Sequence, residues 1–179
     1  TITGEGGSGG AIALAAALLP EDAVMLVCPS DHHIADSAAF RAAALAAAAL
    51  AREDYLVSFG IAADRPETGY GYLRRGEPLA GGYAIREFVE KPDLARAEAY
   101  LASGEYSWNG GIFAFRAGHL LAELAAYRPE MARLVREAVA GGSDDGARFH
   151  PAAEPFAAID GDSIDYAVME NTARAAMVP

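Results

Sequence analysis

Cysteine is almost absent from this sequence of 179 residues, because Cys28 is the only one. A single cysteine cannot form an internal disulfide or a cysteine-based zinc site, which is typical of a reducing cytoplasm. Cys28 lies in an apolar stretch, so we expect a small core residue rather than a nucleophile. Apolar runs of transmembrane length and a basic-then-apolar signal sequence are also missing. We therefore expect a cytoplasmic protein without a membrane partner.

Positive charge is scarce as well. There are 14 lysine and arginine residues against 25 aspartate and glutamate residues, and the net charge is -11. This balance argues against a nucleic acid or an anionic membrane surface as partner, and any bound phosphate would need local cations or backbone amides. The hydrophobic fraction of 53% and the charged fraction of 22% are ordinary for a globular protein. The length favours a single domain.

The first ten residues contain little besides glycine, serine and threonine. Their composition predicts a flexible leader or linker over residues 1–10, with the folded domain over 11–179. A glycine-rich phosphate loop is the alternative. Such a loop needs a lysine and a preceding strand, and both are missing here.

The next part of the chain follows a β-α-β pattern. Val24–Cys28 is a run of five apolar residues, which predicts a strand buried on both faces that ends at Pro29. Asp36 is a candidate N-cap for a helix reaching Arg52, and residues 55–61 form a second strand rich in aromatic and branched side chains. This order predicts parallel strands joined by a right-handed crossover.

The remaining elements are also expected to alternate between strands and helices. They are a helix over 11–19, a strand over 83–90, a helix from Asp93 to Gly104, a loop at 108–109 entering a strand, two helices from Ala117 separated at Pro129, an irregular stretch over 143–160, a helix over 164–171 and a last apolar piece over 175–178. We predict an α/β fold with a mixed, mostly parallel sheet flanked by helices.

Four short segments next to the predicted strands carry polar side chains. They are Asp31 with His32 and His33, then Gly69–Tyr72, then Glu90–Lys91, and then Trp108–Asn109. In a mostly parallel sheet several of them should meet along one edge. A carboxylate suits a hard cation, a lysine suits a phosphate, and a carboxylate with an amide suits sugar hydroxyls.

Each of these segments also has a plainer explanation. Asp31 could merely cap the following segment, and Glu90–Lys91 could be a solvated ion pair. Trp108 could be a core residue. His32 and His33 are adjacent and point to opposite sides, so we do not expect them to bind one metal together.

Five motifs in order make the chain resemble a known family. They are Pro29-Ser30-Asp31-His32, Pro66-Glu67-Thr68-Gly69-Tyr70-Gly71-Tyr72, Phe88-Val89-Glu90-Lys91-Pro92, Trp108-Asn109-Gly110-Gly111-Ile112-Phe113 and Ser163-Ile164-Asp165-Tyr166-Ala167-Val168-Met169-Glu170. Over about residues 11–179 the chain resembles mannose-1-phosphate guanylyltransferases, including the bifunctional type that carries a fused phosphomannose isomerase.

The resemblance implies a Rossmann-like nucleotidyltransferase fold and GDP-mannose synthesis, in which GMP passes from GTP to mannose 1-phosphate and pyrophosphate leaves. It implies Mg²⁺ as cofactor, with Asp31 as a metal ligand and catalytic residue. The resemblance further implies that Lys91 contacts the phosphate of mannose 1-phosphate and is the second catalytic residue. The implied substrate-binding set is Tyr70, Gly71, Glu90, Lys91 and Asn109.

The chain also departs from the family pattern. The family's first strand and arginine-containing GTP loop are absent, and its second magnesium aspartate is expected soon after Pro179. Gly110 stands where serine is usual, and Asn171 stands where lysine is usual. We therefore expect a partial nucleotidyltransferase domain over 11–179 that is inactive as it stands.

Two other functions remain open alternatives. One is a related hexose-1-phosphate nucleotidylyltransferase, and the other is a non-catalytic sugar-phosphate-binding or regulatory domain. The sequence also leaves the oligomeric state open, including a homo-oligomer.

Overall fold

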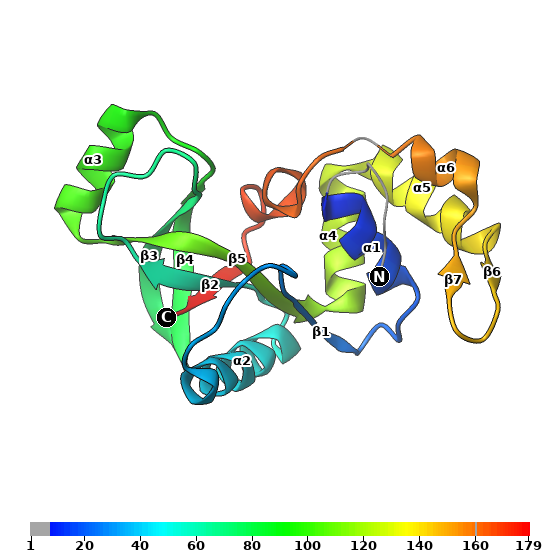
Figure 1. The fold of residues 1–179 in the computed structure, drawn as a ribbon, viewed down its shortest axis with the longest axis horizontal. Helices are drawn as coiled ribbons and strands as arrows, with labels where there is room; N and C mark the ends of the chain where they lie inside the picture. The colour runs from blue at the N-terminus through cyan, green and yellow to red at the C-terminus, as the bar shows by residue number, and fades with distance from the viewer. Residues whose placement is uncertain (1–7, 160) are drawn as a thin grey trace. The chain divides into compact units, whose positions relative to one another are not determined.

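The computed structural model describes residues 8–159 and 161–179. They form two compact units, one drawn from residues 8–23 and 117–171, the other comprising Val24–Arg116 with Thr172–Pro179 (Figure 1). Both units are discontinuous in sequence, so no change of composition along the chain marks a boundary between them.

The second unit is built on a six-stranded sheet. Its strands are β1 (Val24–Val27), β2 (Leu56–Ala62), β3 (Tyr72–Leu79), β4 (Gly82–Val89), β5 (Tyr106–Arg116) and β8 (Ala175–Val178). Their order is β1-β5-β2-β8-β4-β3, and β3 pairs with β5 as well. The long strand β5 therefore contacts three other strands of the sheet.

The sheet is mixed, as predicted, but its neighbouring strands are mostly antiparallel. Only β2 and β8 form a parallel pair among the described strands, so the prediction of a mostly parallel sheet is wrong. The reason lies in β5, which inserts between β1 and β2 and runs opposite to both. Strands β1 and β2 still share one direction, as the β-α-β pattern predicted.

Strand β1 is less buried than its sequence predicts. It lies at an edge of the described sheet, where Leu26 is 45% exposed. Cys28, just beyond it, is exposed, so the prediction of a small core cysteine is wrong. A short apolar run looks the same whether a strand has neighbours on one side or on both, and here β5 is the one neighbour described.

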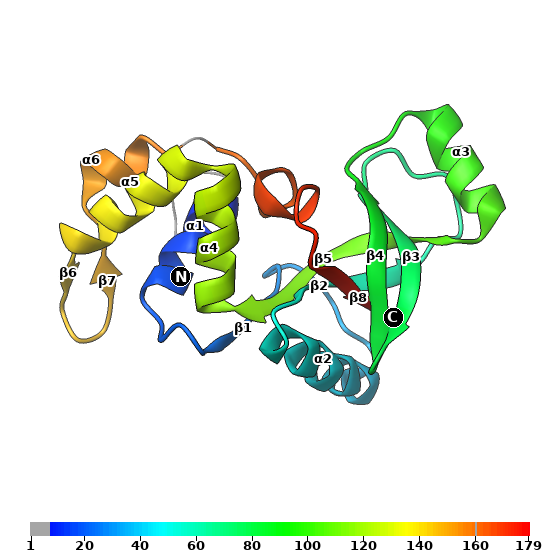
Figure 2. The ribbon, with the colours of Figure 1, turned by 180° about the vertical axis from the view of Figure 1, so that it is seen from behind.

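Two helices pack against this sheet (Figure 2). Both have the caps that their sequences predict. Asp36 accepts hydrogen bonds from the backbone N–H groups of Ala38 and Ala39 and so starts α2 (Ser37–Arg52). The buried residues of α2 pack on the central strands in a cluster of Ala47, Leu50, Val57, Phe59, Ile112, Ala114, Ala176 and Val178.

Helix α3 (Leu94–Ser103) begins at its N-cap Asp93 and ends at Gly104, whose φ of 69° is left-handed. Its buried Ala97 packs with Tyr72 and Trp108 of the sheet. The segment between β4 and β5 therefore folds back onto the sheet beside the predicted binding residues.

The first unit is mainly helical. Its elements are α1 (Ser8–Ala17), α4 (Ala117–Tyr127), α5 (Pro129–Ala140), the hairpin strands β6 (Ser143–Asp144) and β7 (Phe149–His150), α6 (Ala153–Ala157) and the π-helix η1 (Asp165–Met169). Pro129 occupies the first turn of α5, and the predicted apolar stripe of this helix is buried. The hairpin and α6 lie in the stretch that we expected to be irregular.

The predicted leader is helical at its end. Residues 8–10 form the first turn of α1, and Gly9 and Gly10 are buried, so no flexible linker covers these three positions. The rest of the predicted leader, residues 1–7, lies outside the described residues. No helix in the described part of the chain is both long and apolar enough to cross a bilayer.

Candidate functional site

Three of the predicted binding residues meet at one point of the second unit. Gly71 directly precedes β3, Glu90 directly follows β4, and Asn109 lies within β5. The Asn109 N–H donates to the Gly71 carbonyl over 2.8 Å. A Cβ added to the buried Gly71 would overlap Glu90 Oε2 and lie 3.1 Å from Asn109 Cβ. The carboxylate, the glycine and the asparagine are therefore packed against one another.

The Glu90–Lys91 pair occupies two different environments. Lys91 Nζ lies 3.5 Å from Glu90 Oε1, yet the Glu90 side chain is 9% exposed and that of Lys91 is 57% exposed. The backbone of Lys91 is left-handed, with a φ of 48°, and its N–H donates to the Tyr70 carbonyl over 3.2 Å. Such a conformation is unfavourable for a residue other than glycine and is common at functional sites.

The charge distribution follows from this geometry. Lys91 is the only lysine of the chain, so it supplies the only ammonium side chain. It extends from the buried carboxylate into solvent, where it could meet a ligand phosphate. A buried acceptor with an exposed cation beside it differs from the solvated ion pair that was the plainer explanation.

Asn109 lies inside strand β5 rather than in the loop predicted from the sequence. The pairing of β2 with β5 passes from Ser58↔Phe113 to Gly60↔Asn109, so β5 carries extra residues in a bulge. Gly111, with a φ of 67°, supplies the left-handed residue of this bulge. The turn-forming residues Asn109-Gly110-Gly111 therefore form a bulge within β5 and do not precede the strand as a loop.

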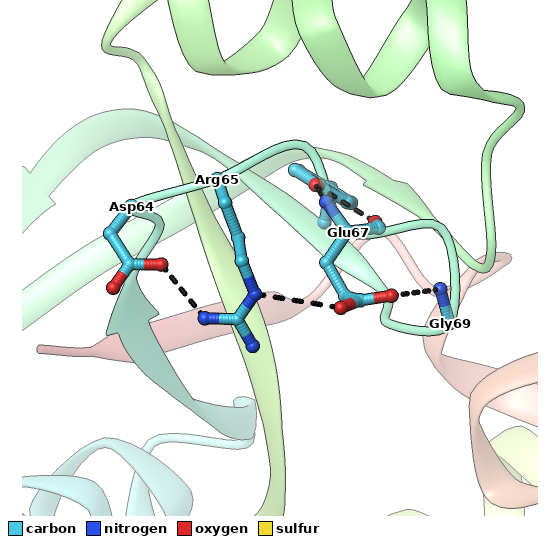
Figure 3. Close-up of polar contacts among 5 residues, drawn as sticks. Asp64, Arg65, Glu67 and Gly69 are labelled. Atoms are coloured by element: carbon cyan, nitrogen blue, oxygen red, sulfur yellow. Dashed lines mark hydrogen bonds and ion pairs between the residues drawn. The ribbon is translucent and has the colours of Figure 1, made fainter.

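The segment before β3 is held by its own polar contacts (Figure 3). Arg65 Nη1 lies 3.0 Å from Asp64 Oδ1, and Arg65 Nε lies 3.6 Å from Glu67 Oε2. The Gly69 N–H donates to Glu67 Oε1 over 3.2 Å. The hydroxyl of the buried Tyr72 donates to the Glu67 carbonyl and accepts from the Glu67 N–H, each over 2.9 Å. These contacts fix the loop that delivers Tyr70 and Gly71.

Tyr70 and Trp108 form an aromatic pair beside this loop. Their rings meet edge to face, with centroids 5.3 Å apart, and the Arg65 guanidinium lies 5.0 Å from the centre of the Trp108 ring. Trp108 is 6% exposed and Tyr70 is 43% exposed. Trp108 is therefore a core residue, as its plainer explanation held, while the Tyr70 side chain is partly exposed.

Asp31 is exposed in the turn that follows β1, at the carboxyl end of that strand. The same turn passes the bulge of β5, because a Cβ on Gly111 would lie 3.7 Å from Pro29 Cγ. Within residues 8–159 and 161–179 no group of three or more histidine, cysteine or acidic side chains is placed to hold a metal. Asp31 fits a hard cation that takes its other ligands from water and substrate phosphates.

A model of the nucleotidyl transferase family matches residues 3–153, which is most of the chain. The chain belongs to the nucleotidyl transferase family. The fold predicted from the sequence is thereby confirmed at the level of the family.

Two relatives show which nucleotidyl transferases this family member resembles. A xanthan biosynthesis protein XanB from Xanthomonas campestris pv. campestris (strain B100) is 51% identical over 158 residues, which cover 88% of this chain and 34% of that protein. A mannose-1-phosphate guanylyltransferase from Escherichia coli (strain K12) is 49% identical over 179 residues, covering 94% and 37%. The chain thus spans about a third of the length of the curated relatives it matches.

Two solved structures resemble this nucleotidyl transferase closely. One is a mannose-6-phosphate isomerase from Helicobacter pylori, with a TM-score of 0.88 and 29% identity, covering 98% of this chain and 69% of the other. The other is a mannose-1-phosphate geranyltransferase from Thermus thermophilus, with a TM-score of 0.84 and 34% identity, covering 96% and 49%.

Proposed function

We propose that the protein takes part in GDP-mannose synthesis, transferring GMP from GTP to mannose 1-phosphate, and that the second unit binds the mannose 1-phosphate. The packed group of Gly71, Glu90 and Asn109 with Lys91 beside it carries this proposal. The names of the relatives support the choice of sugar and nucleotide. The buried carboxylate and amide suit sugar hydroxyls, and the exposed ammonium suits the phosphate.

In this reaction an oxygen of the mannose phosphate attacks the α-phosphorus of GTP. A bond forms between that oxygen and the α-phosphorus, and the bond to the β-phosphate breaks to release pyrophosphate. Glu90 and Asn109 hold the sugar, and Gly71 leaves room for the Glu90 carboxylate. Lys91 lowers the repulsion between the two anionic reactants and orients the attacking phosphate.

A divalent cation fits this reaction because it neutralises charge on phosphate oxygens. Asp31 is the residue that would hold Mg²⁺, in the exposed turn after β1. Its single carboxylate provides one ligand, which suits an ion that arrives with the nucleotide. Tyr70, which is 43% exposed, directly precedes Gly71 at the end of the loop.

Calorimetry with mannose 1-phosphate tests the binding half of the proposal. We expect binding by the wild-type chain and a loss of affinity in Lys91→Ala. Tighter binding of glucose 1-phosphate would favour the related hexose-1-phosphate enzyme instead. The absence of binding to either sugar phosphate would overturn the assignment of this site.

Turnover tests the catalytic half, and it is measured on the protein expressed from its complete gene. We expect GDP-mannose and pyrophosphate from GTP and mannose 1-phosphate in the presence of Mg²⁺. A protein that binds mannose 1-phosphate but forms no GDP-mannose would be the non-catalytic regulatory domain. Preference for a thymidine or uridine triphosphate would indicate the other nucleotidylyltransferase.

A further inference from the structure

Ser58 is a buried polar residue within an apolar strand. It is 0% exposed and lies between Val57 and Phe59 in β2. A buried hydroxyl without a hydrogen bond is costly, and the Ser58 hydroxyl avoids this cost by donating to Asn109 Oδ1 over 2.7 Å. The bond joins residues that are far apart in the sequence, and its acceptor is one of the predicted sugar-binding residues.

A second donor defines which way the Asn109 amide faces. The Gly111 N–H lies 3.2 Å from the same Oδ1 atom. A backbone N–H can only donate, so the atom that faces it must be the amide oxygen. Ser58 and Gly111 therefore hold the Oδ1 end together, and the NH₂ end of Asn109 faces the other way.

The NH₂ end lies on the side of Gly71 and Glu90. Asn109 Nδ2 would be 3.5 Å from a Cβ built on Gly71, and Glu90 Oε2 approaches that same position even more closely. A carboxylate only accepts hydrogen bonds, and an amide NH₂ only donates them. The site thus sets a donor beside an acceptor.

We propose that Ser58 is a positioning residue, which locks the Asn109 amide so that its NH₂ group stands beside the Glu90 carboxylate. This donor and acceptor pair selects ligands with hydroxyl groups that accept from one and donate to the other, such as neighbouring hydroxyls of a hexose 1-phosphate. The choice of ligand rests on the proposed function. The orientation of the amide does not, because Ser58 and Gly111 fix it without a ligand.

The side-chain amides allow a direct test by NMR. The chain contains two asparagines, Asn109 and Asn171, and no glutamine, so a ¹⁵N-labelled sample shows two side-chain NH₂ pairs. We expect Ser58→Ala to change the chemical shifts of the Asn109 NH₂ pair and to leave those of the Asn171 pair unchanged. Ser58→Thr keeps the hydroxyl and should restore the wild-type position.

Ser107 provides the matched control. It is a second buried serine of the same sheet, 6% exposed, in strand β5. Ser107→Ala also removes a buried hydroxyl and should leave the Asn109 pair unmoved. Unchanged Asn109 resonances in Ser58→Ala, or equal shifts in both alanine variants, would overturn the proposal whether or not the protein binds a sugar phosphate.

Ligand binding gives the second readout. Ser58→Ala should weaken mannose 1-phosphate binding about tenfold and leave inorganic phosphate binding, which depends on Lys91, unchanged. Ser58→Thr and Ser107→Ala should bind mannose 1-phosphate like the wild type. Equal loss for both ligands, or wild-type affinity in Ser58→Ala, would contradict the positioning role.

A second variant keeps the test decisive if substitution of Ser58 impairs folding. Asn109→Asp retains an acceptor for Ser58 and Gly111 but replaces the donor beside Glu90 with an oxygen. It should lose mannose 1-phosphate binding more severely than Ser58→Ala while the fold persists. Wild-type affinity in Asn109→Asp would show that the donor is not used and would overturn the proposal.

The two readouts also separate the positioning role from the proposed substrate. If Ser58→Ala changes the chemical shifts of the Asn109 NH₂ pair as expected but the wild type binds no mannose 1-phosphate, the positioning holds and the proposed substrate is wrong.

Discussion

Gly71→Ala is the most direct perturbation of the packed group. The added methyl would overlap Glu90 Oε2 and press on Asn109 Cβ at 3.1 Å. The φ of Gly71 is not positive, so an alanine at this position adopts the same backbone conformation without strain. The whole effect of the substitution must therefore come from crowding between the carboxylate and the amide.

The size of the effect depends on which neighbour moves. If the group stays rigid, overpacking should lower the free energy of unfolding by about 1–3 kcal/mol. If Glu90 rotates away, stability falls less, and the sugar loses a charge-assisted hydrogen bond of roughly 1.5–3 kcal/mol. The second case corresponds to a loss of mannose 1-phosphate affinity of about tenfold to a hundredfold.

Gly69→Ala is the matched control two residues away. The atom nearest to its added Cβ is Glu67 Oε1 at 3.5 Å, which is an ordinary contact. Chemical denaturation and calorimetry with mannose 1-phosphate should both be measured on the two variants. We expect Gly69→Ala to resemble the wild type. If Gly71→Ala matches Gly69→Ala in stability and in affinity, the packed group does not exist as described.

Three further predictions concern other parts of the second unit. Lys91→Ala should lower the affinity for mannose 1-phosphate, measured by calorimetry, about tenfold to a hundredfold. It should change the free energy of unfolding little, because the Lys91 side chain is 57% exposed. Lys91→Arg should recover part of the affinity. Asp36→Ala removes the N-cap of α2 and should lower the free energy of unfolding by about 1 kcal/mol, measured by urea denaturation. Burial and the hydrogen bond to Glu87 raise the pKa of Tyr106 to about 12. A raised folded-state pKa gives stability that is complete below pH ~10 and declines toward pH ~12, so Tyr106→Phe should flatten this decline; an unchanged profile would contradict it.

Local features of the fold could be read from the sequence. Asp36 and Asp93 cap their helices, and Pro129 starts α5, because these signals act within one turn of the backbone. The strand β3 was not predicted, because it contains Gly76, Glu77 and Pro78, which are residue types depleted in strands. The edge position of β1 was not predicted either, because it depends on where β5 inserts.

We expected Gly71, Glu90 and Asn109 to lie close together, and they do, but the strand arrangement that brings them together is not the one we expected. We expected the carboxyl ends of parallel strands to bring them together. Instead β3 and β4 are antiparallel, and the pair Tyr72↔Val89 places the start of one strand beside the end of the other. Gly71 and Glu90 flank that pair. The one unusual feature of Ser58 in the sequence is a hydroxyl group inside an apolar strand. Its role could not be predicted, because its partner Asn109 lies far away in the sequence.

The position of β8 has a consequence for biosynthesis. This strand lies in the middle of the sheet, between β2 and β4, yet it is the last strand along the chain. Leu56 emerges from the ribosome long before its partner Ala175. Until residues 175–178 arrive, the facing edges of β2 and β4 expose unpaired backbone groups that other nascent chains could join. Completion of the sheet therefore waits for residues 175–178, and chaperones that bind nascent chains would act on this protein in that interval.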